Sequence, residues 1–95
     1  MHIIAKRTLR MFWTVHADSQ RPLMRWHRIV DKGQYNNFAE LRRVFPSADM
    51  VNNLVIFNIG GNKYRLIVDI EFRSQTVFIK HILTHKEYDQ GAWKK

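Results

Sequence analysis

The sequence predicts an α+β fold, with N-terminal helices packed on one face of a small antiparallel β-meander sheet and a short C-terminal helix. Two observations support this prediction. In the first half of the chain, apolar residues recur at intervals of three and four, which is the period of a helix. In the second half, apolar and polar residues alternate along runs that end at turn-forming residues, as they do in strands. A chain of 95 residues is expected to form a single domain, residues 1–95.

Two helices are predicted after a short apolar start at residues 3–4. Ser19 is the expected N-cap of the second helix, and Gly33 is expected to end it. The apolar faces are made by Leu9, Phe12, Trp13 and His16 in the first helix and by Leu23, Trp26, Ile29 and Val30 in the second.

Capping patterns predict two further, shorter helices. Asn37 can cap one of them while Glu40 reaches back from the third helical position, and Pro46 is expected to end it. Thr84 and Glu87 have the same spacing, so a short helix is expected near the C-terminal end.

Three strands are predicted, at residues 54–59, 63–73 and 76–83, with turns at residues 60–62 and 74–75. The middle strand alternates, so Tyr64, Leu66, Val68, Ile70 and Phe72 are expected to face the helices, and Lys63, Arg65, Ile67, Asp69 and Glu71 to face the other way. We expect this second face to be partly open and to include Lys80. In the third strand His81 alternates with Val77, Ile79 and Leu83, which predicts a hydrogen-bonded core histidine.

The chain is strongly basic. It has 16 Lys and Arg against 8 Asp and Glu, a net charge of +8 and a pI near 10.3. Such a charge favours a polyanionic partner, chiefly nucleic acid, although it can also serve solubility alone. A membrane partner is disfavoured, because the basic residues do not gather on one amphipathic helix and no apolar run approaches the roughly 20 residues of a membrane span.

The absence of cysteine excludes disulfides, thiol nucleophiles and thiolate zinc sites. The N-terminal residues do not form an apolar stretch of signal-peptide length. These features predict a cytoplasmic protein. The spacing of His, Asp and Glu matches no zinc motif, and Asp69 and Glu71 lie away from Lys63 and Arg65, so we expect no metal site and no cofactor.

Two segments resemble a known family. The run from Val55 to Leu66 contains Phe57-Asn58-Ile59-Gly60-Gly61-Asn62, and Thr84-His85-Lys86-Glu87-Tyr88-Asp89 follows some twenty residues later. Together with Val44-Phe45-Pro46 and Asp49, they resemble the HigB-type mRNA interferase toxins of the RelE superfamily. The resemblance is specific from about residue 38 to residue 89.

The resemblance implies a RelE-like endoribonuclease that acts on mRNA, often on the ribosome, and that is silenced by a helix-turn-helix antitoxin of the HigA type. It also implies that Arg65 is the phosphate-binding arginine, and that His85 and Tyr88 belong to the segment that supplies acid–base or stacking residues. This chain has Ile56 and Asn58 where RelE-like enzymes often carry basic residues, which leaves the general base open.

The chemistry of RNA cleavage fits these residues. RNA carries its own nucleophile, so a metal-free ribonuclease needs a group that removes the 2′-OH proton and a cation that stabilises the charged phosphate. Histidine and arginine are suited to these tasks. If the second turn centres on residues 74–75, Arg65 lies opposite Thr84, so Lys63, Arg65, His85 and Lys86 are expected at one end of the sheet.

The remaining candidates have weaker roles. Lys63, Lys80 and Lys86 are expected to hold phosphates, Asn62 to form the turn with an amide that can read a base, and Trp93 to cover the sheet edge. Two functions stay open at this point. One is a toxin endoribonuclease with mRNA and the ribosome as partners, and the alternative is a non-catalytic basic RNA- or ribosome-binding module.

Overall fold

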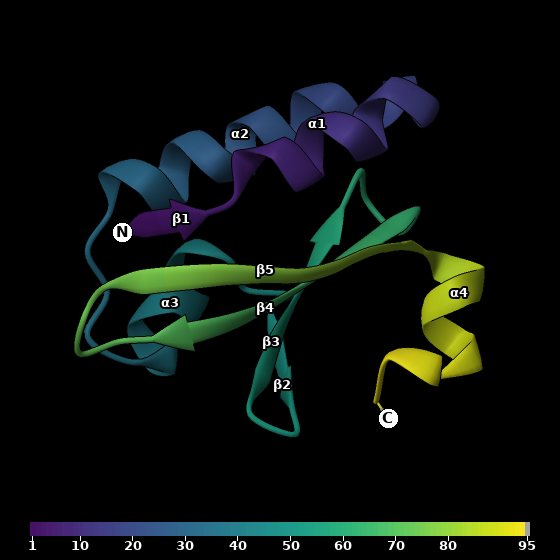
Figure 1. Cartoon of the computed structure of the whole chain (residues 1–95). Helices are drawn as coiled ribbons and strands as arrows, with labels where there is room; N and C mark the ends of the chain where they lie inside the picture. The colour runs from purple at the N-terminus through teal and green to yellow at the C-terminus, as the bar shows by residue number, and fades with distance from the viewer. Residues whose placement is uncertain (95) are drawn as a thin grey trace.

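A five-stranded sheet with helices on one side forms the centre of the molecule. The computed structural model describes residues 1–94 (Figure 1). In chain order its elements are β1 (His2–Ile4), α1 (Lys6–Val15), the short 3-10 helix η1 (Ala17–Ser19), α2 (Gln20–Lys32), α3 (Phe38–Val44), β2 (Asp49–Val51), β3 (Leu54–Ile59), β4 (Tyr64–Glu71), β5 (Thr76–Thr84), α4 (His85–Gln90) and the 3-10 helix η2 (Ala92–Lys94).

The strand order is β1-β5-β4-β3-β2, and the sheet is mixed. The predicted meander is present as β3, β4 and β5, which pair antiparallel. Two strands were missed. β2 pairs antiparallel with the start of β3, and β1 pairs parallel with β5, with His2 opposite Thr76. Each has only three residues, too few for an alternation to be recognised. The α+β class is confirmed, but the sheet is not purely antiparallel.

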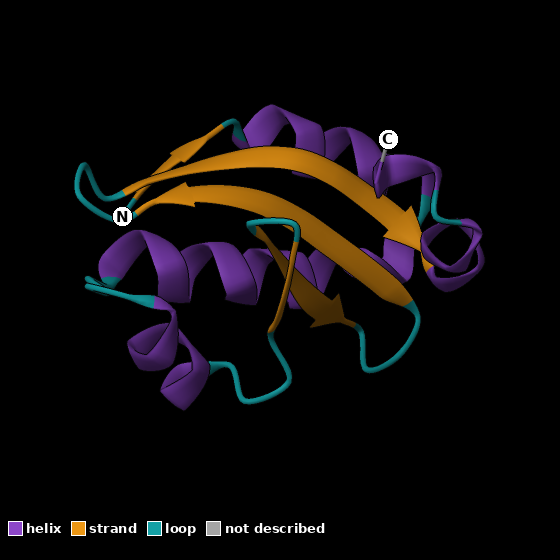
Figure 2. Ribbon diagram, turned by 90° about the horizontal axis from the view of Figure 1, so that it is seen from below, coloured by secondary structure: helices purple, strands orange, loops and turns teal. Residues whose placement is uncertain are grey.

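The main core lies between the sheet and the helices α1, α2 and α3. Figures 1 and 2 show α1 and α2 side by side along one face of the sheet. The predicted apolar faces meet there, and the core contains Leu9, Leu23, Trp26, Val30 and Leu41 from the helices and Val55, Phe57, Leu66, Val68 and Val77 from the strands. The orientation predicted for the middle strand is therefore confirmed for Tyr64, Leu66 and Val68, which are all buried in this core.

The helix boundaries agree with most of the predicted signals. The Asn37 side chain accepts a hydrogen bond from the Glu40 amide at 2.9 Å, and the residue after α2 is Gly33. The prediction for Ser19 was wrong. Its side chain makes no cap bond to α2 and instead donates to the His16 carbonyl at 2.6 Å, because η1 continues directly into α2.

A second, smaller apolar cluster covers part of the opposite face of the sheet. Ile56, Ile67 and Trp93 are buried in it, with Leu83 and Tyr88 packed against them. Trp93 and Tyr88 come from the C-terminal segment, which turns back over this face at the end where β4 begins and β5 ends. The face expected to be partly open is thus covered at one end and exposed at the other.

A β-bulge changes the register between β4 and β5. Ile67 pairs with His81, but Val68 pairs with Ile79, so Lys80 is an extra residue without an opposite partner. As a result His81 lies on the face of Ile67, away from the main core, and is exposed. The prediction of a core histidine was wrong for this reason. Arg65 lies opposite Leu83 rather than Thr84, one residue from the predicted register and at the same end of the sheet.

Candidate active site

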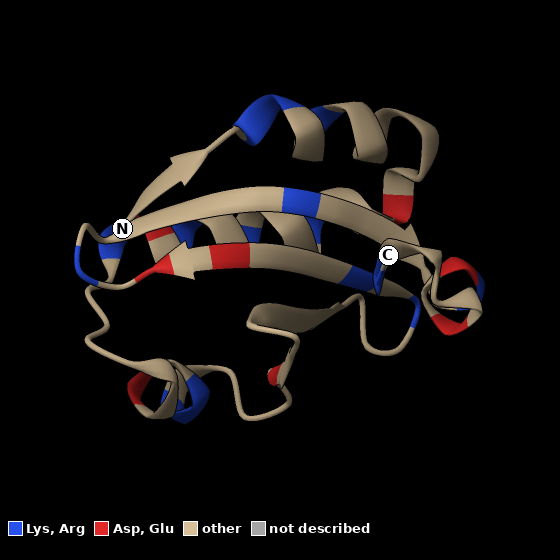
Figure 3. Cartoon of the chain, turned by 60° about the horizontal axis from the view of Figure 1, so that its bottom comes forward, with Lys and Arg blue, Asp and Glu red and all other residues tan. Residues whose placement is uncertain are grey.

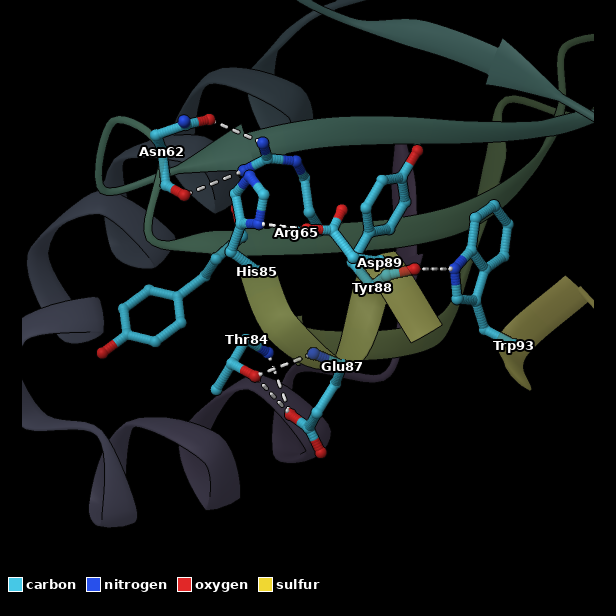
Figure 4. A network of polar contacts seen from close by, with 9 residues as sticks. Asn62, Arg65, Thr84, His85, Glu87, Tyr88, Asp89 and Trp93 are labelled. Carbon is cyan, nitrogen blue, oxygen red and sulfur yellow. Dashed lines mark hydrogen bonds and ion pairs between the residues drawn. The ribbon is translucent and has the colours of Figure 1, made fainter. Parts of the chain in front are cut away.

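Arg65 is buried and held by the turn that precedes it. It is only 8% exposed, although it lies on the face opposite the main core. Nη2 donates to the side-chain oxygen of Asn62 at 2.6 Å, and Nη1 donates to the carbonyls of Asn62 at 3.3 Å and Tyr64 at 3.1 Å (Figure 4). Arg65 is therefore an anchored side chain rather than a solvated one. Asn62 forms the turn, as predicted, and its amide also holds the guanidinium.

Aromatic rings from the C-terminal segment complete the surroundings of Arg65. Its Cζ lies 5.5 Å from the centre of the Tyr88 ring, and the Tyr88 and Trp93 rings stack at 5.1 Å with an angle of 15° between their planes. The indole of Trp93 donates to the Tyr88 carbonyl at 3.0 Å, which ties the two residues together. The guanidinium is thus restrained by hydrogen bonds from the turn and by a cation–π contact with Tyr88.

The helix α4 begins where Arg65 is anchored. Thr84 and Glu87 form the predicted capping box, in which the Glu87 amide donates to Thr84 Oγ1 at 3.2 Å and the Thr84 amide donates to the Glu87 carboxylate at 2.9 Å. The hydrogen bonds that the Thr84 amide and hydroxyl donate to the Glu87 carboxylate lower the pKa of Glu87. The His85 amide donates to the Lys63 carbonyl at 2.9 Å, so the first residue of α4 is fixed to the same turn that holds Arg65.

His85 is paired with an acidic residue that sequence reasoning missed. Its Nδ1 lies 2.8 Å from a carboxylate oxygen of Asp89, one helical turn further along α4. The side chains are 42% and 60% exposed, so solvent and ligands can reach them. When Nδ1 carries the proton and donates a hydrogen bond to Asp89, Nε2 is left as a proton acceptor. The i, i+4 spacing of the two residues was the available signal.

Lys63 lies at the same end of the sheet as Arg65, as predicted, but its side chain does not join Arg65. Its ammonium makes an ion pair with Asp18 of η1 at 2.8 Å, and the Tyr64 hydroxyl donates to the same carboxylate at 2.5 Å. The hydrogen bond from Lys63 is the largest cause of a lowered Asp18 pKa, and the pKa values of Lys63 and Tyr64 are raised in turn by Asp18. Lys63 belongs to the turn before β4, so the alternation of that strand does not reach it.

The other two lysines are exposed on the surface. Lys86 is exposed in the first turn of α4, beside His85. Lys80 is exposed in the bulge of β5, further along the same face as Arg65, which is the face predicted for it. The structure therefore brings together Asn62, Arg65, His85 and Tyr88 from the predicted set, and adds Asp89 and Trp93 to them.

Two negative observations concern residues 1–94. Within that part of the chain, His, Asp and Glu side chains do not gather in groups of three or more that could hold a metal ion. In the same range, every helix is too short or too polar to cross a membrane.

The chain matches the model of a known protein family over most of its length. Residues 19–91 match the family model HigB_toxin, described as a RelE-like toxic component of a toxin-antitoxin system. The chain belongs to the HigB toxin family. It is 33% identical over 92 residues to the mRNA interferase toxin HigB of Escherichia coli strain K12, covering 94% of this chain and 88% of that one. It is 30% identical over 93 residues to the mRNA interferase HigB of Escherichia coli O6:H1, covering 95% and 90%.

We predict that Trp93 is a main source of stability on this side of the toxin. Trp93→Ala should lower the free energy of unfolding by about 2–4 kcal/mol, because it removes a buried ring from a small cluster. Trp93→Phe should recover part of the loss by restoring a ring on Tyr88. Urea denaturation measures both, with Val15→Ala as a matched surface control, since Val15 is 78% exposed. Equal stability of the Ala variant and the control would contradict the assigned role.

Proposed function

We propose that this toxin is an endoribonuclease that cleaves mRNA without a metal or cofactor, by attack of the 2′-OH on the adjacent phosphate. It then inhibits translation and growth until an antitoxin neutralises it. The curated relatives bear the name mRNA interferase, which supports this activity. The observation that carries the proposal is the anchored Arg65 beside the His85–Asp89 pair at one end of the sheet (Figure 4).

The reaction needs a group that takes the 2′-OH proton, a cation that stabilises the charge on the phosphate, and a proton for the leaving 5′-oxygen. The first two tasks are assigned to His85 and Arg65. His85 Nε2 takes the proton of the 2′-OH, with Asp89 orienting the ring through Nδ1 and stabilising the imidazolium that forms. Arg65 donates to the phosphate oxygens that gain charge in the transition state, through the donors that Asn62 and Tyr64 leave free. The leaving 5′-oxygen takes its proton from solvent, because this side of α4 is open to water.

The remaining candidates bind rather than react. Asn62 and Tyr88 hold the Arg65 guanidinium in one orientation, so that little reorganisation is needed when charge develops. Lys63, Lys80 and Lys86 contribute positive charge for the RNA backbone, and Lys63 does so from beside Asp18.

The proposed partners are the ribosome and a helix-turn-helix antitoxin of the HigA type. The helices α1 and α2 carry seven exposed basic residues, namely Lys6, Arg7, Arg10, Arg21, Arg25, Arg28 and Lys32. These helices pack on the sheet face opposite Arg65, so their charge is available to a polyanion other than the RNA at the site. The toxin is expected to act in the cytoplasm, where translation takes place.

Cleavage of isolated RNA in the presence of a chelator tests the proposal. The toxin should generate a 5′ fragment with a 2′,3′-cyclic phosphate or its opened 3′-phosphate, since these follow from attack by the 2′-OH. The rate should be unchanged by the chelator, because the residues proposed to act are side chains of the protein. A loss of activity that added Mg²⁺ restores would contradict the metal-free mechanism. Binding without cleavage, on isolated RNA and on translating ribosomes alike, would favour the RNA- or ribosome-binding module.

A further inference from the structure

The bulge in β5 places three exposed side chains in a row that leads away from Arg65. They are His81, Lys80 and Phe78, and we call them the β5 track. His81 lies opposite Ile67 and Phe78 lies opposite Asp69, so both are on the face of the sheet that holds Arg65. Lys80 is the extra residue between the two paired positions, and its ammonium lies 5.9 Å from the centre of the Phe78 ring, on the same face.

The β5 track has the composition of a surface for single-stranded nucleic acid. Phe78 is a large apolar residue that is 38% exposed, and Lys80 and His81 next to it are exposed as well. An exposed ring offers a stacking platform to any base, and cations beside it can contact the phosphates of the same nucleotide. Without the bulge, His81 would alternate into the main core, and the track would lose one of its polar groups.

The track is continuous with the candidate active site. Leu83, opposite Arg65, and Phe78 are five positions apart on β5, which corresponds to roughly 16 Å at about 3.3 Å per residue. Two acidic residues of β4 lie on this face as well, Asp69 opposite Phe78 and Glu71 nearer the turn that carries the exposed Arg73, and Figure 3 shows red segments on this strand.

We propose that the β5 track binds nucleotides of the RNA substrate that flank the scissile bond on one side, with a base stacked on Phe78 and its backbone held by Lys80 and His81. This inference rests on the proposed function, since it extends the same RNA across the sheet. In this proposal the bulge creates a second RNA contact beyond the reacting phosphate. RNA is favoured over a protein segment by the lysine beside the ring and by continuity with Arg65.

Binding of RNAs of different length tests the proposal. We would use a short RNA carrying a 2′-O-methyl group at the cleaved position, which blocks the reaction, and versions extended on the 5′ or the 3′ side. Fluorescence anisotropy gives the Kd for the wild type, Phe78→Leu, Lys80→Ala and the control Val15→Ala. The wild type should bind one of the two extended RNAs more tightly than the short one. The affinity of Phe78→Leu should fall roughly tenfold for that RNA only, as expected from the loss of one base–aromatic stack.

The other variants separate charge from stacking. Lys80→Ala should weaken binding of the same extended RNA and reduce the slope of log K against log[salt] by about 0.7, as expected for one contact with a single strand. Val15→Ala, on the exposed side of α1, should match the wild type on every RNA. Phe78→Leu and Val15→Ala should bind the short RNA as tightly as the wild type.

Three results would overturn the proposal. The first is a wild type that gains nothing from either extension, and the second is an equal loss by Phe78→Leu on short and extended RNA. The third is unchanged RNA binding by the variants together with weaker binding of the antitoxin, which would assign the surface to that partner. Normal cleavage of unmodified short RNA in these cases would leave the proposed function intact. Absence of both binding and cleavage by the wild type, on isolated RNA and on translating ribosomes alike, would refute the function itself.

Discussion

Replacing Arg65 by Ala is expected to slow single-turnover cleavage of RNA by about 10²–10³-fold at saturating toxin. The reason is that Arg65 is held in advance by Asn62 and Tyr64 and by the ring of Tyr88, so its donors need no rearrangement when the phosphate gains charge. Affinity for uncleavable RNA should fall much less, because the remaining basic residues still contact the backbone.

Arg65→Lys is the informative companion to this variant. A lysine keeps the charge but loses the planar fork that both Asn62 and a phosphate require, so its rate should remain well below that of the wild type. Arg65 is buried, and thermal unfolding of each variant must show a folded protein before rates are compared. Wild-type cleavage by a folded Arg65→Ala variant would remove Arg65 from the mechanism.

The second large effect is expected at His85. Its replacement by Gln should cost about 10²–10⁴-fold in the cleavage step, as for a group that transfers a proton. Asp89→Asn should cost at most as much as His85→Gln, because it leaves the imidazole present but removes the carboxylate that orients it. The double variant His85→Gln/Asp89→Asn should be no slower than His85→Gln alone, since two residues that act as a unit are not additive.

Lys86→Ala is the matched control on the same helix. It is exposed next to His85 and should weaken RNA binding without changing the rate at saturation. If Asp89→Asn slowed cleavage by the same factor in the His85→Gln variant as in the wild type, the two residues would act independently. Asp89 would then not be a positioning residue for His85.

Much of the fold could be predicted from the sequence, because its signals are local. The alternation in β4 and the capping residues Asn37 and Thr84 depend only on near neighbours, and the structure confirms all three. The bulge at Lys80 could not be predicted, since the alternation of apolar residues continues on both sides of it. One extra residue was enough to reverse the face assigned to His81.

The candidate site could be predicted only in part, because some of its contacts join distant parts of the chain. Its end of the sheet followed from the position of the turns, so Arg65 and His85 were placed at the same end correctly. Partners that come from distant parts of the chain could not be predicted. Lys63 pairs with Asp18, forty-five positions away, and the burial of Arg65 depends on a C-terminal segment that folds back over the sheet. Asp89 needed no distant contact and could have been found from its spacing to His85.

The parallel pairing of β1 with β5 affects how a newly made chain folds. β1 is synthesised before its partner β5, and the residues that pair, such as His2 and Thr76, are far apart in the sequence, so this edge of the sheet stays open until β5 has emerged. Contacts between such distant residues form slowly, because a long loop must be closed before they contribute any stability. The end of β5 continues directly into α4, which begins at His85. A nascent toxin that acts as proposed therefore remains harmless to the ribosome that makes it until β5 and α4 have emerged.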